Sequence, residues 1–193
     1  GDVFAHDIVK SGVAFGTTAA SDGPATARSF ILVTPDGERT MNTYLGACQN
    51  LSEADIDPAT VARAKVTYLE GYLWDPPGAK AAFRKAASLA HAAGREVALT
   101  LSDTFCVDRY RAEFRELIRS GAVDLVFANE RELKSLYETA DFDTALEALR
   151  SEAKRAAVTR SEKGAVIIEG KLTIKVAASP IESLVDATGA GDA

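Results

Sequence analysis

One ten-residue stretch, Val123-Asp-Leu-Val-Phe-Ala-Asn-Glu-Arg-Glu132, contains a strand followed directly by the start of a helix. Its apolar first part is typical of a buried strand. Asn129 suits the N-cap of a helix that runs to about Tyr137, and Glu132, three residues later, has the spacing of a capping box. A strand that leads at once into a helix is the repeating unit of α/β proteins.

The same alternation extends on both sides of this stretch. Further strands are predicted at 66–71, 96–101, 156–159, 165–169 and 172–176, and further helices at about 79–93, 107–119 and 144–152. This pattern predicts an α/β fold with a mainly parallel sheet and helices on both faces. Nearer the start of the chain, strands at 27–34 and 39–45 flank a turn at 35–38 and predict a small β-hairpin.

Composition and charge narrow the classes of protein that the chain can represent. It has 193 residues, of which 47% are hydrophobic and 26% charged, as in soluble globular proteins. Its net charge of −6 argues against a nucleic-acid partner, which needs a basic face. Neither a membrane span nor a signal peptide is predicted, so we expect a cytoplasmic location. Cys48 and Cys106 match no metal spacing and are expected to be free thiols.

Polar motifs follow three of the predicted strands or their approach, where open α/β sheets bind ligands. They are Asn129-Glu-Arg-Glu132, Thr159-Arg-Ser-Glu-Lys-Gly164 and Asp186-Ala-Thr-Gly-Ala-Gly-Asp-Ala193. In the last motif, Gly189, Ala190 and Gly191 could cradle a phosphoryl group beside Asp192, which would take a proton from an alcohol. The structural alternative is a tight turn with a capping aspartate.

The other two motifs also have two interpretations each. Asn129 could face phosphate oxygens while Glu132 orders the waters of Mg²⁺, or the two residues could form only a capping box. The hydroxyls of Thr159 and Ser161, with open backbone at Gly164, could hold the ribose or phosphate of a nucleotide, or the segment could be only a turn.

Taken together, the three motifs resemble those of the PfkB (ribokinase-like) carbohydrate and nucleoside kinase family. Residues 186–193 look like its second signature, Asn129-x-x-Glu132 like its N-x-x-E motif, and 159–164 like its T-x-G-x-x-G nucleotide loop. The resemblance covers essentially the whole chain. The segments 35–42 and 68–72 look most like the adenosine-kinase-type members.

This resemblance implies transfer of the γ-phosphoryl group of ATP to a hydroxymethyl group of a nucleoside (adenosine-like) or a sugar, with Mg²⁺. Asp192 would be the base, and Gly189, Ala190 and Gly191 would form an anion hole. Asn129 and Glu132 would serve the Mg²⁺–phosphate end, and Thr159, Ser161 and Gly164 the nucleotide. The resemblance also raises a monovalent-cation site that involves Asp186.

The resemblance divides the chain into two regions. Residues 1–50 would be the end of the sugar-binding region and the β lid, and residues 51–193 the nucleotide-binding core, with both termini incomplete. Met41, Thr43 and Leu45 alternate onto one lid face and could cover a purine or sugar, or they could only pack within the hairpin. A homodimer through the lid is left open.

Some residues depart from the family pattern. Ser161 stands where glycine is usual and Ala187 where threonine is frequent, while the family's G-G-x-x-x-N region is absent from this chain. The alternative to a kinase is therefore a non-catalytic nucleotide-binding module, or an inactive fragment of such a kinase. A dinucleotide-dependent dehydrogenase is set aside, because no G-x-G-x-x-G follows the first strand.

Overall fold

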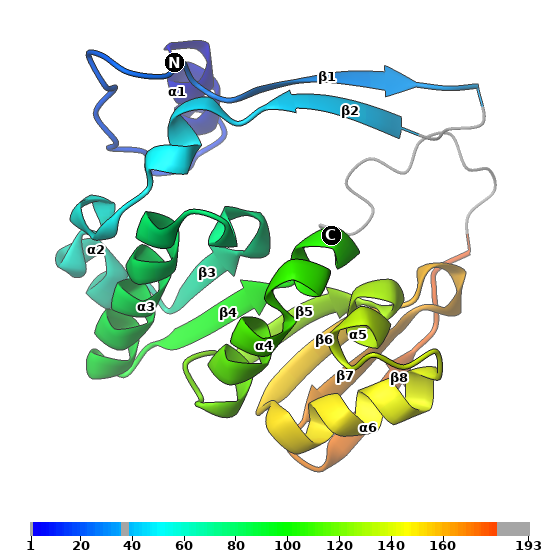
Figure 1. Cartoon of the computed structure of the whole chain (residues 1–193). Helices are drawn as coiled ribbons and strands as arrows, with labels where there is room; N and C mark the ends of the chain where they lie inside the picture. The colour runs from blue at the N-terminus through cyan, green and yellow to red at the C-terminus, as the bar shows by residue number, and fades with distance from the viewer. Residues whose placement is uncertain (1, 36–38, 181–193) are drawn as a thin grey trace. The chain divides into compact units, whose positions relative to one another are not determined.

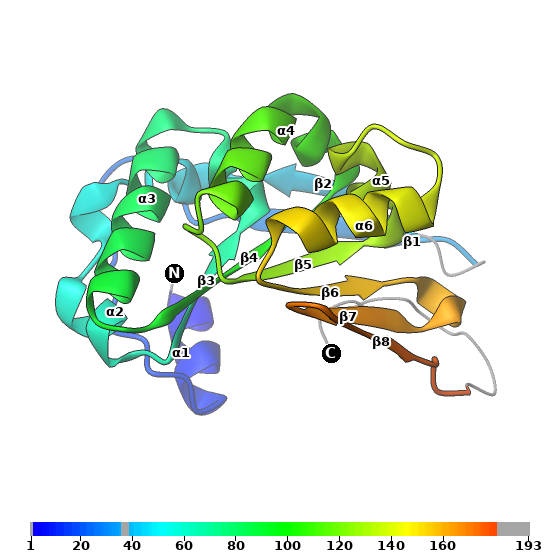
Figure 2. The same ribbon diagram turned by 90° about the horizontal axis from the view of Figure 1, so that it is seen from below.

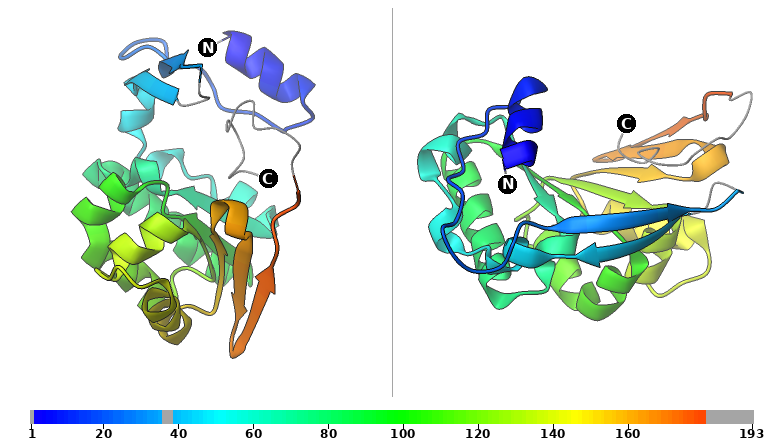
Figure 3. Two further views of the ribbon diagram at one scale, coloured as in Figure 1. Left: turned by 90° about the vertical axis from the view of Figure 1, so that its right-hand side faces the viewer. Right: turned by 90° about the horizontal axis from the view of Figure 1, so that it is seen from above.

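The computed structural model describes residues 2–35 and 39–180, which separate into two compact units, Gly1–Gln49 and Asn50–Ala193. In the first unit, helix α1 (Asp2–Lys10) precedes strands β1 (Arg28–Val33) and β2 (Arg39–Tyr44). The two strands pair antiparallel as a long ribbon (Figure 3). The predicted hairpin is confirmed, although residues 36–38 of its turn lie outside the described residues.

The second unit contains the alternating elements that the sequence predicted, together with helix α2, which it did not predict (Figure 1). In chain order they are α2 (Pro58–Arg63), β3 (Val66–Glu70), α3 (Pro77–Ala92), β4 (Glu96–Thr100), α4 (Thr104–Arg119), β5 (Leu125–Asn129), α5 (Glu130–Leu136), α6 (Phe142–Glu152), β6 (Arg155–Thr159), β7 (Ala165–Glu169) and β8 (Leu172–Val176). Among the residues described, no helix is both long and apolar enough to cross a membrane.

The strands of this unit form one mixed sheet in the order β3-β4-β5-β6-β7-β8. β3 to β6 are parallel to one another, while β7 and β8 are antiparallel to their neighbours. The predicted α/β class with a mainly parallel sheet is confirmed. The spatial order of the strands equals their order in the chain, which constrains where the connecting helices lie.

Helices α3, α4, α5 and α6 lie on the same side of the sheet (Figure 2). Crossovers between parallel strands are almost always right-handed, so connections that all advance in one direction place their helices on one face. Helices were expected on both faces. Within residues 50–180 they cover only one, and the other face carries exposed side chains that include Val66, Tyr68 and Phe127.

Aspartates that cap the helices explain where two of them begin. The Asp103 carboxylate accepts a hydrogen bond of 2.6 Å from the Cys106 N–H, so α4 begins three residues before its predicted start. The Asp141 carboxylate accepts one of 2.8 Å from the Thr144 N–H, so α6 begins two residues early. A capping side chain satisfies an N–H that the first turn of a helix leaves open.

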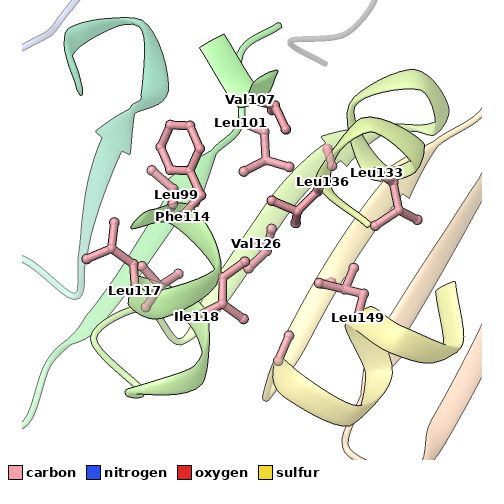
Figure 4. Close-up of a cluster of buried hydrophobic side chains, with 14 of the residues drawn as sticks. Leu99, Leu101, Val107, Phe114, Leu117, Ile118, Val126, Leu133, Leu136 and Leu149 are labelled. Atoms are coloured by element: carbon pink, nitrogen blue, oxygen red, sulfur yellow. The ribbon is translucent and has the colours of Figure 1, made fainter. Parts of the chain in front are cut away.

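The core lies between the sheet and the helices that cover it (Figure 4). Phe114, Leu117 and Ile118 of α4 are buried, and Tyr110 is partly buried and packs against the same core. They meet buried side chains from the strands and the later helices, among them Leu99, Val126, Leu133 and Leu149. Burial of this apolar surface is the main force that holds the layers together.

A buried carboxylate ties three elements together at the edge of the sheet where β5 begins. Asp124 accepts hydrogen bonds from His91 of α3 at 2.7 Å, from the Val97 N–H of β4 at 2.9 Å and from Lys154 before β6 at 2.6 Å. Burial alone would raise the pKa of Asp124, but the bonds from Lys154, His91 and Val97 outweigh it and lower the pKa to about 2.

Replacing this carboxylate should destabilise the second unit. We expect Asp124→Asn to lower the free energy of unfolding by about 1–2 kcal/mol, because Lys154 loses its charged partner and the backbone contacts weaken. The depressed pKa places this stabilisation above pH 3.8, and it should be lost as the pH falls from 3.8 towards about 2.

Urea unfolding of both proteins across that pH range measures the difference. The exposed Asp143→Asn is the control and should change the free energy of unfolding by less than about 0.5 kcal/mol. An Asp124→Asn penalty that is equally large at the two ends of the range would contradict the expected role of the charge.

Candidate functional site

The carboxyl ends of β5 and β6 bring two of the predicted site residues side by side. In the parallel ladder between these strands, Asn129 is the register partner of Thr159. Because both strands run in the same direction, the loops that follow them leave from the same edge of the sheet. The start of α5 and the segment 160–164 are therefore neighbours.

Asn129 and Glu132 form the capping box that their spacing predicted. The Asn129 side-chain oxygen accepts from the Glu132 N–H at 2.9 Å, and the Glu132 carboxylate accepts from the Asn129 N–H at 2.9 Å. The Asn129 amide nitrogen also donates to Glu132 Oε1 at 2.6 Å. The structural interpretation of this motif thus holds, and its proposed role toward phosphate and Mg²⁺ is additional to it.

Glu132 is a buried carboxylate in an acidic neighbourhood. Only 4% of the surface of Glu132 is exposed to solvent. Burial raises the pKa of Glu132, the hydrogen bond from the Asn129 N–H lowers it, and the charges of Asp103 and Glu70 raise it further. Three carboxylates from the carboxyl ends of three strands thus make this edge of the sheet negative, which favours a cation.

Glu70, at the end of β3, is hydrogen-bonded to Ser102, which follows β4, and the sequence did not predict this contact. Ser102 has a φ of +70° and donates a hydrogen bond to Glu70 Oε1, while it accepts one from the Tyr72 N–H at 3.1 Å. Tyr68 also donates to Glu70, at 3.2 Å. The available signal was that Glu70 ends one strand and Ser102 follows the next.

The segment after β6 is a tight loop closed by its own backbone. Arg160 N–H donates to Gly164 O at 2.7 Å, and Gly164 N–H donates to Ser161 O at 3.0 Å. Ser161 has a φ of +51°, in the left-handed region that favours glycine. This conformation gives a physical reason for the glycine that the family usually has where this chain has Ser161.

Gly164 is required by the fold itself. Its φ is +85°, and a Cβ built on it would lie 2.0 Å from Val176 O and 2.7 Å from Ala178 N. The loop therefore packs backbone to backbone against the chain that leaves β8. A side chain has no room there.

One open pocket of about 440 Å³ joins the two motifs. It is lined by Asn129, Thr159, Ser161, Gly164, Ala165, Val176, Ala177 and Ala178. Four of the residues that the sequence proposed for the nucleotide, Asn129, Thr159, Ser161 and Gly164, thus line one pocket. Glu132 does not line it. A hollow of about 560 Å³ over the exposed side of α6 contains none of the predicted site residues.

The predicted lid residues belong to the first unit. Met41 pairs with Ile31 and Thr43 with Ser29, so Met41 and Thr43 share one face of the ribbon, where the Thr43 and Ser29 hydroxyls lie 2.8 Å apart. Leu45 follows the end of β2. Met41, Thr43 and Leu45 are all exposed.

Other predicted site residues lie outside the described residues. They are Asp186, Gly189, Ala190, Gly191 and Asp192, together with the approach to them at 181–185. Within residues 2–35 and 39–180, no group of three or more His, Cys, Asp or Glu side chains could hold a metal ion.

Comparisons with known proteins agree on one family. The pfkB family carbohydrate kinase profile matches residues 1–193. The chain is 59% identical to an adenosine kinase from Sinorhizobium meliloti and 56% identical to a probable sugar kinase from Rhizobium etli CFN 42. Both structures superpose with a TM-score of 0.95, and the matches cover 99% of this chain and 58% of each of theirs. No match is found among curated proteins.

A more distant structure shares the fold. The putative Ribokinase II from E. coli, in complex with ATP and Mg²⁺, is 22% identical and superposes with a TM-score of 0.85, over 99% of this chain and 62% of that one.

The contacts of Gly164 predict a large effect of a small substitution. We expect Gly164→Ala to lower the free energy of unfolding by about 2–4 kcal/mol, because the new methyl group meets both an unfavourable φ and the backbone of Val176. Gly170→Ala is the matched control, since Gly170 has a φ of +56° and nothing within 4 Å of a built Cβ.

Gly170→Ala should lower the free energy of unfolding by only about 1–2 kcal/mol, the cost of a left-handed φ in a residue with a Cβ. Urea unfolding of the two variants measures the difference between them. Equal losses would show that the close approach to Val176 does not constrain the loop.

Proposed function

This chain belongs to the pfkB family of carbohydrate kinases, and we propose that the protein transfers the γ-phosphoryl group of ATP to a hydroxymethyl group of a small molecule. The observation that carries this proposal is the pocket shared by Asn129, Thr159, Ser161 and Gly164. It lies beyond the carboxyl ends of β5 and β6, where open α/β sheets bind their ligands.

For the acceptor, we propose an adenosine-like nucleoside, with a sugar as the alternative. The similarity to the adenosine kinase from S. meliloti, at 59% identity, supports a nucleoside. The similarity to the probable sugar kinase from R. etli is almost as high, at 56%, and supports the alternative. Met41, Thr43 and Leu45 are the lid residues proposed to cover the acceptor, because two of them share a ribbon face.

For the nucleotide, we propose that the motifs at 129–132 and 159–164 contact different parts of ATP. We propose that the hydroxyls of Thr159 and Ser161 and the backbone at Gly164 hold the ribose or phosphates of ATP, and that Asn129 faces the phosphate oxygens. Ser161 and Gly164 have positive φ values, which lets backbone approach a ligand closely.

We propose that Mg²⁺ is held near Glu132 mainly by the phosphates of the nucleotide, since the described residues form no metal-binding group of their own. Burial and the charges of Asp103 and Glu70 make an uncompensated carboxylate unfavourable there, and a cation relieves that cost. We propose that Glu132 and Asn129 serve this end through water and phosphate, since Mg²⁺ commonly keeps several waters. When bound, Mg²⁺ neutralises charge on the phosphates. We also propose that a monovalent cation binds at a site that involves Asp186.

The chemistry itself is proposed for the last residues of the chain. Asp192 would take the proton of the acceptor hydroxyl, and the backbone N–H groups of Gly189, Ala190 and Gly191 would stabilise charge on the phosphoryl group. Support comes from the sequence of this motif and from the family match, which extends to residue 193.

We propose that the protein acts in the cytoplasm on small molecules and not on nucleic acid. Both cysteines, Cys48 and Cys106, are free thiols, which suits a reducing compartment. The net charge of −6 disfavours a polyanionic partner.

The proposed function predicts how turnover and ATP binding separate at Asp192. In the full-length protein, Asp192→Asn should lower kcat about 10²- to 10⁴-fold, because the general base is lost. The dissociation constant for ATP should change by less than about two-fold, because the backbone contacts remain. Transfer from [γ-³²P]ATP to adenosine, inosine, ribose and fructose measures turnover, and calorimetry measures ATP binding.

The exposed Asp143→Asn serves as the control and should leave turnover and binding unchanged. Equal loss of ATP binding and turnover in Asp192→Asn would assign Asp192 a structural role. A wild-type protein that binds ATP but phosphorylates none of the four acceptors would favour the non-catalytic module.

We further propose that two copies pair through the lid. Both faces of the β1–β2 ribbon carry exposed apolar side chains, Ile31 and Met41 on one face and Phe30 and Leu32 on the other. A two-stranded ribbon is marginally stable alone. A ligand would cover only the face of Met41, which leaves the face of Phe30 for a second copy.

This arrangement predicts that charge on the second face breaks the dimer. Phe30→Lys should raise the dimer dissociation constant at least about ten-fold, because a buried ammonium group loses its hydration. Sedimentation equilibrium of the full-length protein measures it. Ala20→Lys, in the exposed loop before β1, adds the same charge as a control and should leave the dimer intact. A monomeric wild type would refute the proposal.

A further inference from the structure

Arg160 belongs to the loop of the candidate site but does not line its pocket. Its neighbours Thr159 and Ser161 do line it. The Arg160 side chain is 20% exposed, and its Nε donates to Glu130 Oε2 at 2.8 Å. Its guanidinium carbon lies 3.7 Å from the centre of the Phe142 ring. The charged group is thus already engaged on two sides by the protein itself.

Glu130 is a well-satisfied partner for this arginine. It is the first residue of α5, and its side chain is 18% exposed. Its other oxygen accepts from Lys134, four residues along the helix, at 2.7 Å. The hydrogen bonds from Lys134 and from Arg160 hold the pKa of Glu130 at about 2. The carboxylate is therefore ionised at neutral pH, and its place at the start of a helix is electrostatically favourable.

The Arg160–Glu130 ion pair lies directly beyond the last paired residues of β5 and β6. Asn129 is paired with Thr159 in the sheet, and Glu130 and Arg160 are the next residues on each side. Phe142, which is 6% exposed, begins α6. One guanidinium group therefore joins the start of α5, the start of α6 and the loop after β6.

We propose that Arg160 is a positioning residue, which fixes the loop 160–164 against the start of α5 through Glu130 and Phe142. This inference rests on the proposed function in one respect, which is that the two segments so joined bind one ATP. Asn129 would serve its phosphates, and Thr159 and Ser161 its remaining contacts. Arg160 then acts through the loop and does not touch the nucleotide.

A direct phosphate contact is the competing role for an arginine in such a loop. It would require the guanidinium group to leave both Glu130 and the Phe142 ring. Partly buried charge-assisted hydrogen bonds and stacking on an aromatic face oppose that movement. The two roles differ in whether the effect of changing Arg160 depends on Glu130.

Kinetics of the full-length protein separate the two roles. Glu130→Gln and Arg160→Gln should each raise the KM for ATP about five-fold while kcat changes less than about two-fold, because the substitutions displace the loop and leave the proposed base in place as a chemical group. The double variant should show no larger KM than the worse single variant, because both changes break one interaction. Arg160→Lys should restore only part of the affinity, since lysine lacks the planar fork.

A matched ion pair at the opposite end of the same strand provides the control. Arg155 of β6 donates to Glu96 of β4 at 2.5 Å, far along the strand from the loop. Glu96→Gln and Arg155→Gln should leave the KM for ATP within about two-fold of the wild type.

Hydrogen exchange tests the positioning without any nucleotide. The Lys163 and Gly164 N–H groups donate to Arg160 O and Ser161 O, both at 3.0 Å. In Glu130→Gln and Arg160→Gln these two amides should exchange about ten-fold faster than in the wild type, while those of Ala156 and Val158 inside β6 keep their rates.

The outcomes distinguish this inference from the proposed function. If the KM increases of the two single variants multiply in the double variant, Arg160 binds ATP directly and the inference is overturned. Loop amides that exchange at wild-type rates in both single variants overturn it as well. A wild type without ATP turnover refutes the proposed function instead, and the exchange rates then decide whether Arg160 positions the loop.

Discussion

The parallel pairing of β5 with β6 is the constraint on which the candidate site depends. It runs from Leu125↔Arg155 to Asn129↔Thr159, and it delivers two polar loops to the same edge of the sheet. If β6 shifted by one residue along β5, Val158 would turn away from the core in which it is now buried. The apolar side chains that bury these strands therefore also fix the distance between the segments proposed to hold ATP.

The residues proposed to bind the nucleotide at this edge of the sheet also have structural roles. Asn129 caps α5, and Gly164 has no room for a side chain whatever it binds. Ser161 accepts an unfavourable φ of +51° within a hydrogen-bonded loop. Strained backbone persists only where the surroundings determine it strongly. Here the Gly164 N–H donates to Ser161 O, and Gly164 itself packs against Val176. The same rigidity would preorganise the loop for a ligand, because less conformational freedom is lost on binding.

Two further features of the second unit are the acidic edge of the sheet and the sheet face opposite helices α3 to α6. Glu70, Asp103 and Glu132 come from the ends of three different strands. Each carboxylate accepts a hydrogen bond from a neighbouring group, and these bonds offset the repulsion between the three charges. On the uncovered face, Tyr68 and Phe127 form a tilted ring pair with centres 6.5 Å apart. Both features follow from strands that run in chain order with right-handed crossovers.

The sequence alone determined the strands, most of the helices and the hairpin, because periodicity and capping residues act over a few neighbouring positions. It also identified the motifs at Asn129, Thr159 and Asp192, with their family, although Asp192 lies outside the described residues. No prediction covered α1 or α2. The tertiary structure alone decided that helices α3 to α6 cover the same face of the sheet, that Asp124 joins three elements and that Arg160 is held by Glu130 and Phe142. These contacts join residues far apart in the chain, and no local pattern specifies such partners.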